Sequence, residues 1–159
     1  MTILIDKKQI VENNQEILPV SHAAIIIALT GKTLKDKPTY GQGIDLLIDY
    51  FKENKILFKV YECKTPDSAK KVIEHKDVRK VWIFGHGWMD ALYFGNNGNL
   101  IYSDFKDVSE EQKKDFIGQF HCNPDADPQS SLAGYILKPD GKKFVREGYC
   151  CAYKNRQAI

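Results

Sequence analysis

The clearest pattern in the chain is a set of four short, mostly apolar stretches separated by polar or amphipathic segments. Each is five to seven residues long, and together they cover Ala23–Leu29, Leu57–Tyr61, Lys80–Phe84 and Phe116–Phe120. Apolar runs of this length, rich in β-branched and aromatic residues, are typical of strands buried on both faces, which belong to parallel sheets covered by helices. The pattern therefore predicts four strands of one sheet.

The segments between the first three strands predict two helices. A polar stretch rich in glycine, proline and lysine, Thr30–Gly43, is expected to form a loop, and apolar residues then recur at helical spacing over Ile44–Asn54. A second helix is predicted to begin at Thr65, Pro66 and Asp67. Threonine can cap a helix, proline suits the first helical position, and aspartate suits the positive end of the helix dipole.

A hairpin and a short helix are predicted between the third and fourth strands. Asn97-Gly98 lies between the apolar stretches Ala91–Phe94 and Leu100–Tyr102, and such a pair is a strong hairpin signal. Ser109 and Gln112 have the spacing of a capping box, which predicts a short helix there.

The two ends of the chain are less informative. Residues 1–20 carry no clear pattern and form an unassigned lead-in. After the fourth strand, Asp127-Pro128 favours a helix from Gln129 to about Leu137. The alternative is a hairpin that pairs Tyr135–Leu137 with Phe144–Arg146.

The alternation of strands and helices predicts a single α/β domain over residues 1–159 with a mainly parallel sheet. Ligands of such sheets bind at the carboxyl ends of the strands. One edge of an open sheet could also pair with a second copy of the chain.

Composition and charge exclude some classes of function. The net charge is +2 and the lysine pairs are scattered, which disfavours a nucleic-acid-binding surface. No segment approaches the roughly 20 apolar residues of a membrane span, and the first residues do not resemble a signal peptide. The four cysteines are not spaced like a disulfide framework, so we expect reduced thiols in a cytoplasmic protein.

The candidate chemistry is a histidine and a cysteine at the ends of two predicted strands. His86 lies two residues beyond Phe84, and Cys122 lies two residues beyond Phe120. Neighbouring strands run about 4.8 Å apart, so the two side chains can meet at one edge of the sheet. A cysteine beside a histidine acquires a lowered pKa and becomes a nucleophile at neutral pH.

The residues around this pair suggest supporting roles. Gly85 and Gly87 flank the histidine, so a substrate backbone can come close, and the backbone N–H of Gly87 and that of Cys122 could face an oxyanion. Trp88, Asp90 and Asn123 are candidate substrate contacts, with Asp90 suited to a basic side chain.

The order of these motifs resembles the caspase-like cysteine peptidases, a broad group that includes caspases, gingipains, separase and bacterial CHAT domains. The resemblance rests on Gly41-Gln-Gly-Ile-Asp45, Val81-Trp-Ile-Phe-Gly-His-Gly87, the hairpin after it, and the strand that ends in Cys122, 36 residues after His86. It implies a doubly wound sheet of order 2-1-3-4 with helices on both faces. It also implies that His86 is the general base and Cys122 the nucleophile, that the substrate is a peptide or protein, and that no metal or organic cofactor is needed.

Two positions depart from that family's pattern. His121 stands where a small residue usually precedes the cysteine, and Pro124, which has no N–H, stands where several members have glycine. A catalytically inactive interaction or regulatory module on the same fold is therefore the alternative. A weaker alternative is a small zinc- or ligand-binding protein, although no Cys-x-x-Cys pair supports a zinc site.

Overall fold

The structure is a computed structural model, and it describes residues 8–11, 16–121 and 129–145. Its larger sheet contains β1 (Lys8–Val11), β2 (His22–Ala28), β3 (Phe58–Cys63), β4 (Val78–Phe84), β8 (Lys114–Phe120) and β9 (Leu137–Val145). A smaller sheet contains β5 (His86–Trp88), β6 (Ala91–Tyr93) and β7 (Asn99–Ile101). The helices are α1 (Gly31–Glu53), α2 (Pro66–Glu74) and α3 (Leu132–Ile136), with 3₁₀ turns η1 (Gly95–Asn97), η2 (Tyr102–Phe105) and η3 (Glu110–Gln112).

The larger sheet has the strand order β1-β3-β2-β4-β8-β9, and every neighbouring pair of strands is parallel. All seven residues of β2 are buried, as expected for a central parallel strand covered on both faces. The predicted α/β class with a mainly parallel sheet is therefore confirmed. The four predicted strands correspond to β2, β3, β4 and β8, whereas β1, β5 and β9 were not predicted.

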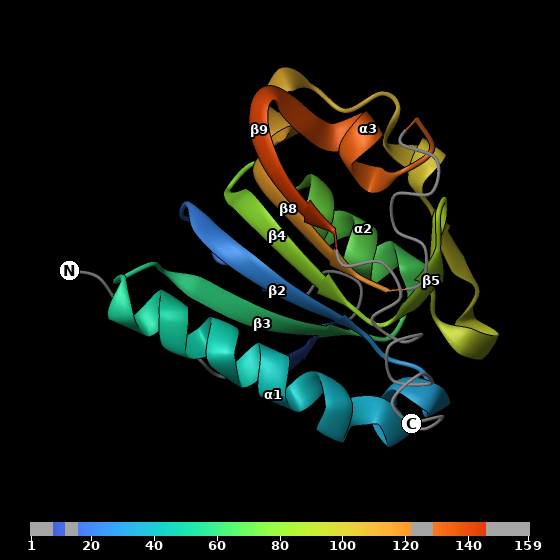
Figure 1. Ribbon diagram of the computed structural model, residues 1–159. Coiled ribbons are helices and arrows are strands. Elements are labelled where there is room, and N and C mark those ends of the chain that lie inside the picture. Colours follow the sequence, from blue (N-terminus) through green and yellow to red (C-terminus); the bar gives the residue numbers. More distant parts are fainter. Residues whose placement is uncertain (1–7, 12–15, 122–128, 146–159) are drawn as a thin grey trace.

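Alternate residues of β2 point into two separate apolar layers. Ile25 packs in the same cluster as α1, whose Ile44, Leu47 and Phe51 are buried. Ile26 packs in the second cluster, which contains the buried sides of α2, α3 and the β6–β7 hairpin. Figure 1 shows α1 along one face of the sheet and α2 behind the other face.

The capping signals are confirmed where the sequence predicted them. Thr65 caps α2: its side chain accepts a hydrogen bond from the N–H of Ser68, and the Ser68 side chain accepts one from the N–H of Thr65. Ser109 and Gln112 form a capping box as well, but it opens only the single 3₁₀ turn η3. The hairpin across Asn97-Gly98 is also present, formed by β6 and β7.

The predicted loop Thr30–Gly43 is wrong, because α1 already begins at Gly31. Glycine and proline in this stretch have low helix propensity, so propensity alone favoured a loop. Helix formation is cooperative, however, and the packed turns from Ile44 to Phe51 supply a nucleus from which the helix can extend toward its N-terminus. No helix in the described part of the chain, α1 included, is long and apolar enough to cross a membrane.

At the other end, the predicted helix is shorter than expected and the alternative hairpin is wrong. Helix α3 has five residues, and the Ser131 side chain caps it by accepting a hydrogen bond from the N–H of Gly134. The chain then enters β9, which pairs in parallel with β8 so that Phe144 lies opposite Gly118. Tyr135 and Phe144 therefore belong to different elements and do not form a hairpin.

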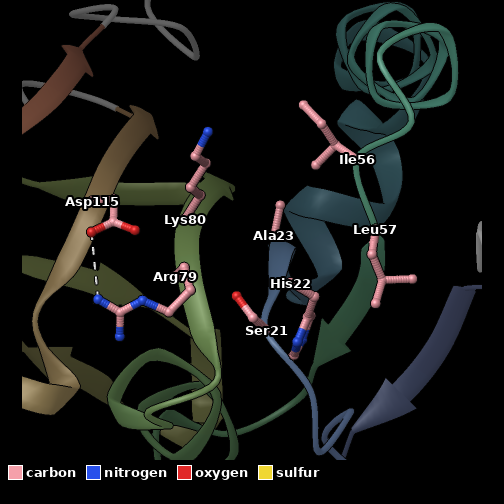
Figure 2. A pocket seen from close by; sticks show the side chains of 8 residues that line it. All are labelled: Ser21, His22, Ala23, Ile56, Leu57, Arg79, Lys80 and Asp115. Atoms are coloured by element: carbon pink, nitrogen blue, oxygen red, sulfur yellow. Dashed lines mark hydrogen bonds and ion pairs between the residues drawn. The ribbon is translucent and has the colours of Figure 1, made fainter. Parts of the chain in front are cut away.

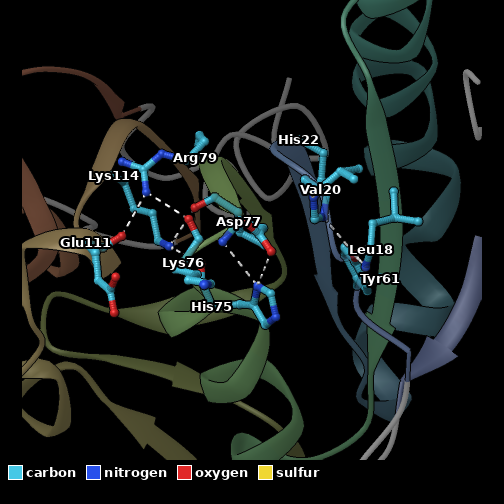
Figure 3. Close-up of polar contacts among 11 residues, drawn as sticks. Leu18, Val20, His22, Tyr61, His75, Lys76, Asp77, Arg79, Glu111 and Lys114 are labelled. Carbon is cyan, nitrogen blue, oxygen red and sulfur yellow. Dashed lines mark hydrogen bonds and ion pairs between the residues drawn. The ribbon is translucent and has the colours of Figure 1, made fainter. Parts of the chain in front are cut away.

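A lysine is buried where β8 begins. Lys114 has no exposed surface, and its Nζ donates to the carbonyl oxygens of His75, 2.8 Å away, and Val78, 2.6 Å away (Figure 3). Burial, with a smaller contribution from the charge of Arg79, lowers the pKa of this ammonium group to about 7. A lysine in the unfolded chain has a pKa near 10.5.

We expect this lysine to make the fold more stable as the pH rises from about 7 to 8.5. In that range the unfolded chain keeps the proton on Lys114 while the folded chain releases it, so the free energy of unfolding increases, by at most about 1.4 kcal/mol per pH unit. Urea denaturation at several pH values should show this slope in the native chain and not in Lys114→Met. Parallel curves for the two proteins would contradict the expectation.

Candidate functional site

The chain leaves the larger sheet at Gly85 and turns into β5, which carries His86. His86 is half-buried and lies opposite Tyr93 in the β5–β6 pair. Gly85 is buried against the end of β2, and a Cβ at position 85 would lie 2.9 Å from the Cβ of Ala28. Only glycine lets β4 end this close to β2, so the position of His86 depends on that contact.

Strands β4 and β8 are neighbours, and Phe84 lies opposite Phe120. Their rings stack with centroids 4.6 Å apart. The residues that follow these two phenylalanines therefore leave the sheet from adjacent positions on its carboxyl edge. Cys122 and Asn123, which follow Phe120, lie outside the described residues.

His121, the last described residue before Cys122, is fully buried in a polar cluster. Its Nε2 lies 2.9 Å from the hydroxyl oxygen of Tyr102 and 3.1 Å from the amide nitrogen of Gln119. All three side chains have no exposed surface. Burial raises the pKa of the Tyr102 hydroxyl, which therefore remains neutral and available for hydrogen bonding.

The imidazole of His121 lies directly against Gly87. A Cβ at position 87 would be 2.9 Å from Nδ1 of His121 and 2.7 Å from the carbonyl oxygen of Ala91. The residue after His86 is thus in contact with the residue before Cys122. This contact brings the segment around His86 next to the residue that precedes Cys122 in the chain.

Trp88 and Asp90 lie at the turn between β5 and β6, on the surface. The Trp88 side chain is 44% exposed, and Asp90 is also exposed. The backbone carbonyl of Asp90 accepts a hydrogen bond of 2.9 Å from the N–H of Tyr102, which ties this turn to the buried cluster. Partial burial and the negative charge of Asp90 raise the pKa of the nearby Tyr93 hydroxyl.

Cys63 is the one cysteine within the described residues, and it is fully buried at the end of β3. Burial raises the pKa of its thiol to about 12, so this cysteine is protonated and shielded at neutral pH. Cys122, Cys150 and Cys151 lie outside the described residues. Among the residues that the structure does describe, no group of three or more His, Cys, Asp or Glu side chains could hold a metal ion.

A small hollow of about 200 Å³ lies at the opposite edge of the sheet, where the strands begin (Figure 2). Its polar groups are largely occupied by contacts within the chain. Arg79 donates to the carbonyl oxygens of Glu111 and Lys113, at 2.9 and 2.7 Å. The nitrogens of His22 lie 2.7 Å from the carbonyl oxygen of Val20 and 2.8 Å from the hydroxyl of Tyr61. The carboxyl edge, with His86 and the His121 cluster, is therefore the stronger candidate.

The polar cluster around His121 was not identified from the sequence, where His121 stood out only as a departure from the pattern of the caspase-like peptidases. Gln119 lies in β8 and His121 follows its last residue, two positions later, so alternation places the two side chains on the same face of the sheet. This spacing of two polar residues was the one feature of the sequence that could have indicated a polar cluster here. Tyr102 gave no such indication, because it reaches the cluster from η2 after a turn that the sequence pattern does not specify.

The comparisons with known proteins found no match: no family model fits the chain, and no curated protein or solved structure is similar to it.

Proposed function

We propose that this chain is a caspase-like cysteine peptidase domain in which His86 is the general base and Cys122 the nucleophile. The observation that carries the proposal is the contact of His121 with Gly87, which joins the residue after the histidine to the residue before the cysteine. Two side chains that exchange a proton must approach within hydrogen-bonding distance. A contact between their immediate neighbours favours that approach.

The arrangement of the sheet also supports the proposal. Its four central strands follow the order β3-β2-β4-β8, which in chain order is 2-1-3-4, and helices lie on both faces. This is the order that the resemblance to caspase-like peptidases implies for a doubly wound sheet. The segments that lead to the proposed dyad leave the sheet at the carboxyl ends of the adjacent strands β4 and β8, and ligands of open α/β sheets bind at such ends.

In the proposed reaction, the Cys122 thiol gives its proton to the His86 imidazole, and the sulfur attacks the carbonyl carbon of a peptide bond. A C–S bond forms, and the carbonyl oxygen carries the negative charge until the C–N bond breaks. The leaving amine takes the proton from His86, leaving an acyl-enzyme thioester. Water then attacks the thioester and gives one proton to His86. The C–S bond breaks, His86 returns the proton to the sulfur of Cys122, and the carboxylic acid leaves.

The backbone near His86 is proposed to stabilise the oxyanion, with N–H groups of Gly87 and Cys122 as the donors. Gly85 and Gly87 are both buried against other parts of the chain, so the expectation that a substrate backbone approaches these two glycines is not supported. The exposed carboxylate of Asp90 and the exposed ring of Trp88 lie on the adjacent turn. They suit a substrate with a basic side chain next to an apolar one.

The test is the pH dependence of alkylation at each cysteine, followed by mass spectrometry on the folded chain. We expect Cys122 to react with iodoacetamide well below pH 8, because proton transfer to His86 stabilises its thiolate. In His86→Ala the same thiol should require a pH at least about one unit higher. Cys63 is the internal control, because its buried thiol should react only if the chain unfolds.

His75→Ala is the matched control, because His75 is a partly exposed histidine at the other edge of the sheet. It should leave the alkylation profile of Cys122 unchanged. If Cys122 titrates like an ordinary thiol both in the native chain and in His86→Ala, the peptidase proposal is wrong. The catalytically inactive interaction module would then be the better description.

A further inference from the structure

We propose that the outer face of the three-stranded sheet β5–β6–β7 binds an extended peptide segment and selects an arginine side chain through Trp88 and Asp90. The inference rests on the proposed function only for the fate of the bound peptide, because binding at this face requires no nucleophile. The residues of this sheet and of its turns all belong to the part of the chain that the structure describes.

The register of the small sheet places its side chains on two opposite faces. Leu92 and Leu100 lie opposite one another in the β6–β7 pair, and both are buried in the apolar layer that contains α2. Side chains alternate along a strand, so the neighbours of these leucines point to the outer face. That face has one row of Trp88, Ala91 and Ile101 and a second row of His86, Tyr93 and Asn99.

Two large apolar side chains of the outer face are open to solvent. Trp88 is 44% exposed and Ile101 is 39% exposed, and they lie on either side of the buried Ala91 in one row. Tyr93, in the next row, is partly exposed. Neighbouring exposed apolar side chains with polar groups around them are typical of surfaces that bind other molecules, and tryptophan and tyrosine are enriched there.

The charge of this region differs from that of the whole chain. The chain has 23 lysine and arginine residues, yet none lies between Lys80 and Lys106. The acidic residues of that stretch are Asp90, at the β5–β6 turn, and Asp104, in η2, and both are exposed. Fixed negative charge beside an apolar surface favours a positively charged partner. Charge complementarity therefore assigns a basic peptide to this face.

The residue types at the β5–β6 turn favour arginine over lysine. Trp88 and Asp90 are two positions apart at the same end of the outer face. A planar guanidinium group stacks on an indole ring and forms paired hydrogen bonds with a carboxylate, whereas an ammonium group cannot do both in this way. Partial burial and the negative charge of Asp90 raise the pKa of the Tyr93 hydroxyl, so this carboxylate also acts on the second row.

The spacing of the two rows fits an extended peptide. The rows are two residues apart along the strands, which corresponds to roughly 6.8 Å, and alternate side chains of an extended peptide have the same separation. For a peptide that runs along the strands, an arginine over Trp88 places the side chain two residues away over the second row, against the ring of Tyr93. An apolar side chain suits that position.

The test is the binding of two labelled peptides, measured by fluorescence anisotropy. Both have the sequence Leu-Ala-Xaa-Ala-Leu with blocked ends, where Xaa is arginine in one and citrulline, its uncharged analogue of similar shape, in the other. The full chain carrying Cys122→Ala is used, so that no peptide is cleaved by the proposed reaction during the measurement. We expect the arginine peptide to bind at least about threefold more tightly than the citrulline peptide.

Substitutions on the outer face should remove this selectivity. Trp88→Ala and Asp90→Asn should each lower the affinity for the arginine peptide by about threefold or more. Asp90→Asn should also remove the preference over citrulline and weaken the dependence of binding on salt. Tyr50→Ala and Asp49→Asn are the matched controls, because they change an exposed aromatic ring and an exposed carboxylate on α1. Both controls should bind the two peptides as the unsubstituted outer face does.

The proposal is overturned if the two peptides bind equally, if neither binds, or if the controls on α1 weaken binding as much as Trp88→Ala and Asp90→Asn. A dimer in sedimentation that Trp88→Ala dissociates would assign the face to a second copy of the chain and overturn it as well. Selective binding without hydrolysis of the arginine peptide by the native chain would uphold this inference and contradict the proposed function. Hydrolysis without selective binding would do the reverse.

Discussion

Gly87→Ala is expected to destabilise the fold by about 3 kcal/mol and to abolish the reactivity of Cys122. The added methyl group would lie 2.7 Å from the carbonyl oxygen of Ala91 and 2.9 Å from Nδ1 of His121, closer than such atoms normally approach. One obstacle is backbone and the other is a ring held by two hydrogen bonds, so neither can move cheaply. Overpacking at rigid sites typically costs between 1 and about 3 kcal/mol. Urea denaturation and alkylation of Cys122 in the same samples measure both effects.

Gly31→Ala is the control for this substitution. No atom lies within 4 Å of the Cβ that alanine would add there, and Gly31 is exposed at the start of α1. Alanine is also the better helix former, so the free energy of unfolding should stay within about 0.5 kcal/mol of the native value. A Gly87→Ala variant as stable as Gly31→Ala would mean that His121 is not held against Gly87.

The sheet was largely predictable because its strands carry their own signal. The stretch Ala23–Leu29 is a continuous apolar run, and every residue of β2 is buried, so the apolar pattern of the sequence agrees with the observed burial. The helix α2 was predictable for a similar reason, since Thr65, Pro66 and Asp67 satisfy local capping requirements. Elements of this kind depend on residues close in sequence.

The elements that were missed depend on partners far away in sequence. Strand β9 carries Pro139, Asp140 and Gly141, which favour a turn, and it becomes a strand only because β8 offers an unpaired edge. Strand β5 has three residues and is defined by its pairing with β6. Local propensity cannot specify such segments, because the energy that orders them comes from tertiary pairing.

The candidate site also has one part that the sequence predicts and another that it does not. The register of β4 and β8 follows from two apolar strands, so the adjacency of the segments after Phe84 and Phe120 could be expected from the sequence. The hydrogen bond between Tyr102 and His121 could not be expected from the sequence, because Tyr102 belongs to η2 and no sequence pattern indicates this contact. His121, which departs from the pattern of the caspase-like peptidases that the sequence resembles, has an environment that only the structure reveals.

Cys122→Ala is expected to lower the rate of peptide hydrolysis at least roughly a thousandfold, the largest effect that the proposal implies. Without the sulfur no acyl-enzyme can form, and what remains is the binding and orientation of water by the rest of the site. Quenched fluorescent peptide mixtures provide the measurement. One set carries arginine or lysine before the cleaved bond and a matched set carries aspartate, because the proposal pairs the exposed Asp90 with a basic side chain of the substrate.

Cys150→Ala and Cys151→Ala provide the controls, since the proposed reaction uses neither thiol. Both variants should hydrolyse the basic peptides at the native rate, and Cys122→Ala should unfold at the same urea concentration as they do, which separates lost chemistry from lost folding. Hydrolysis that persists in Cys122→Ala would assign the activity to another group or to a contaminant. A preference for the aspartate set would leave the dyad intact and remove Asp90 from the specificity site, because a carboxylate at that turn repels a like charge.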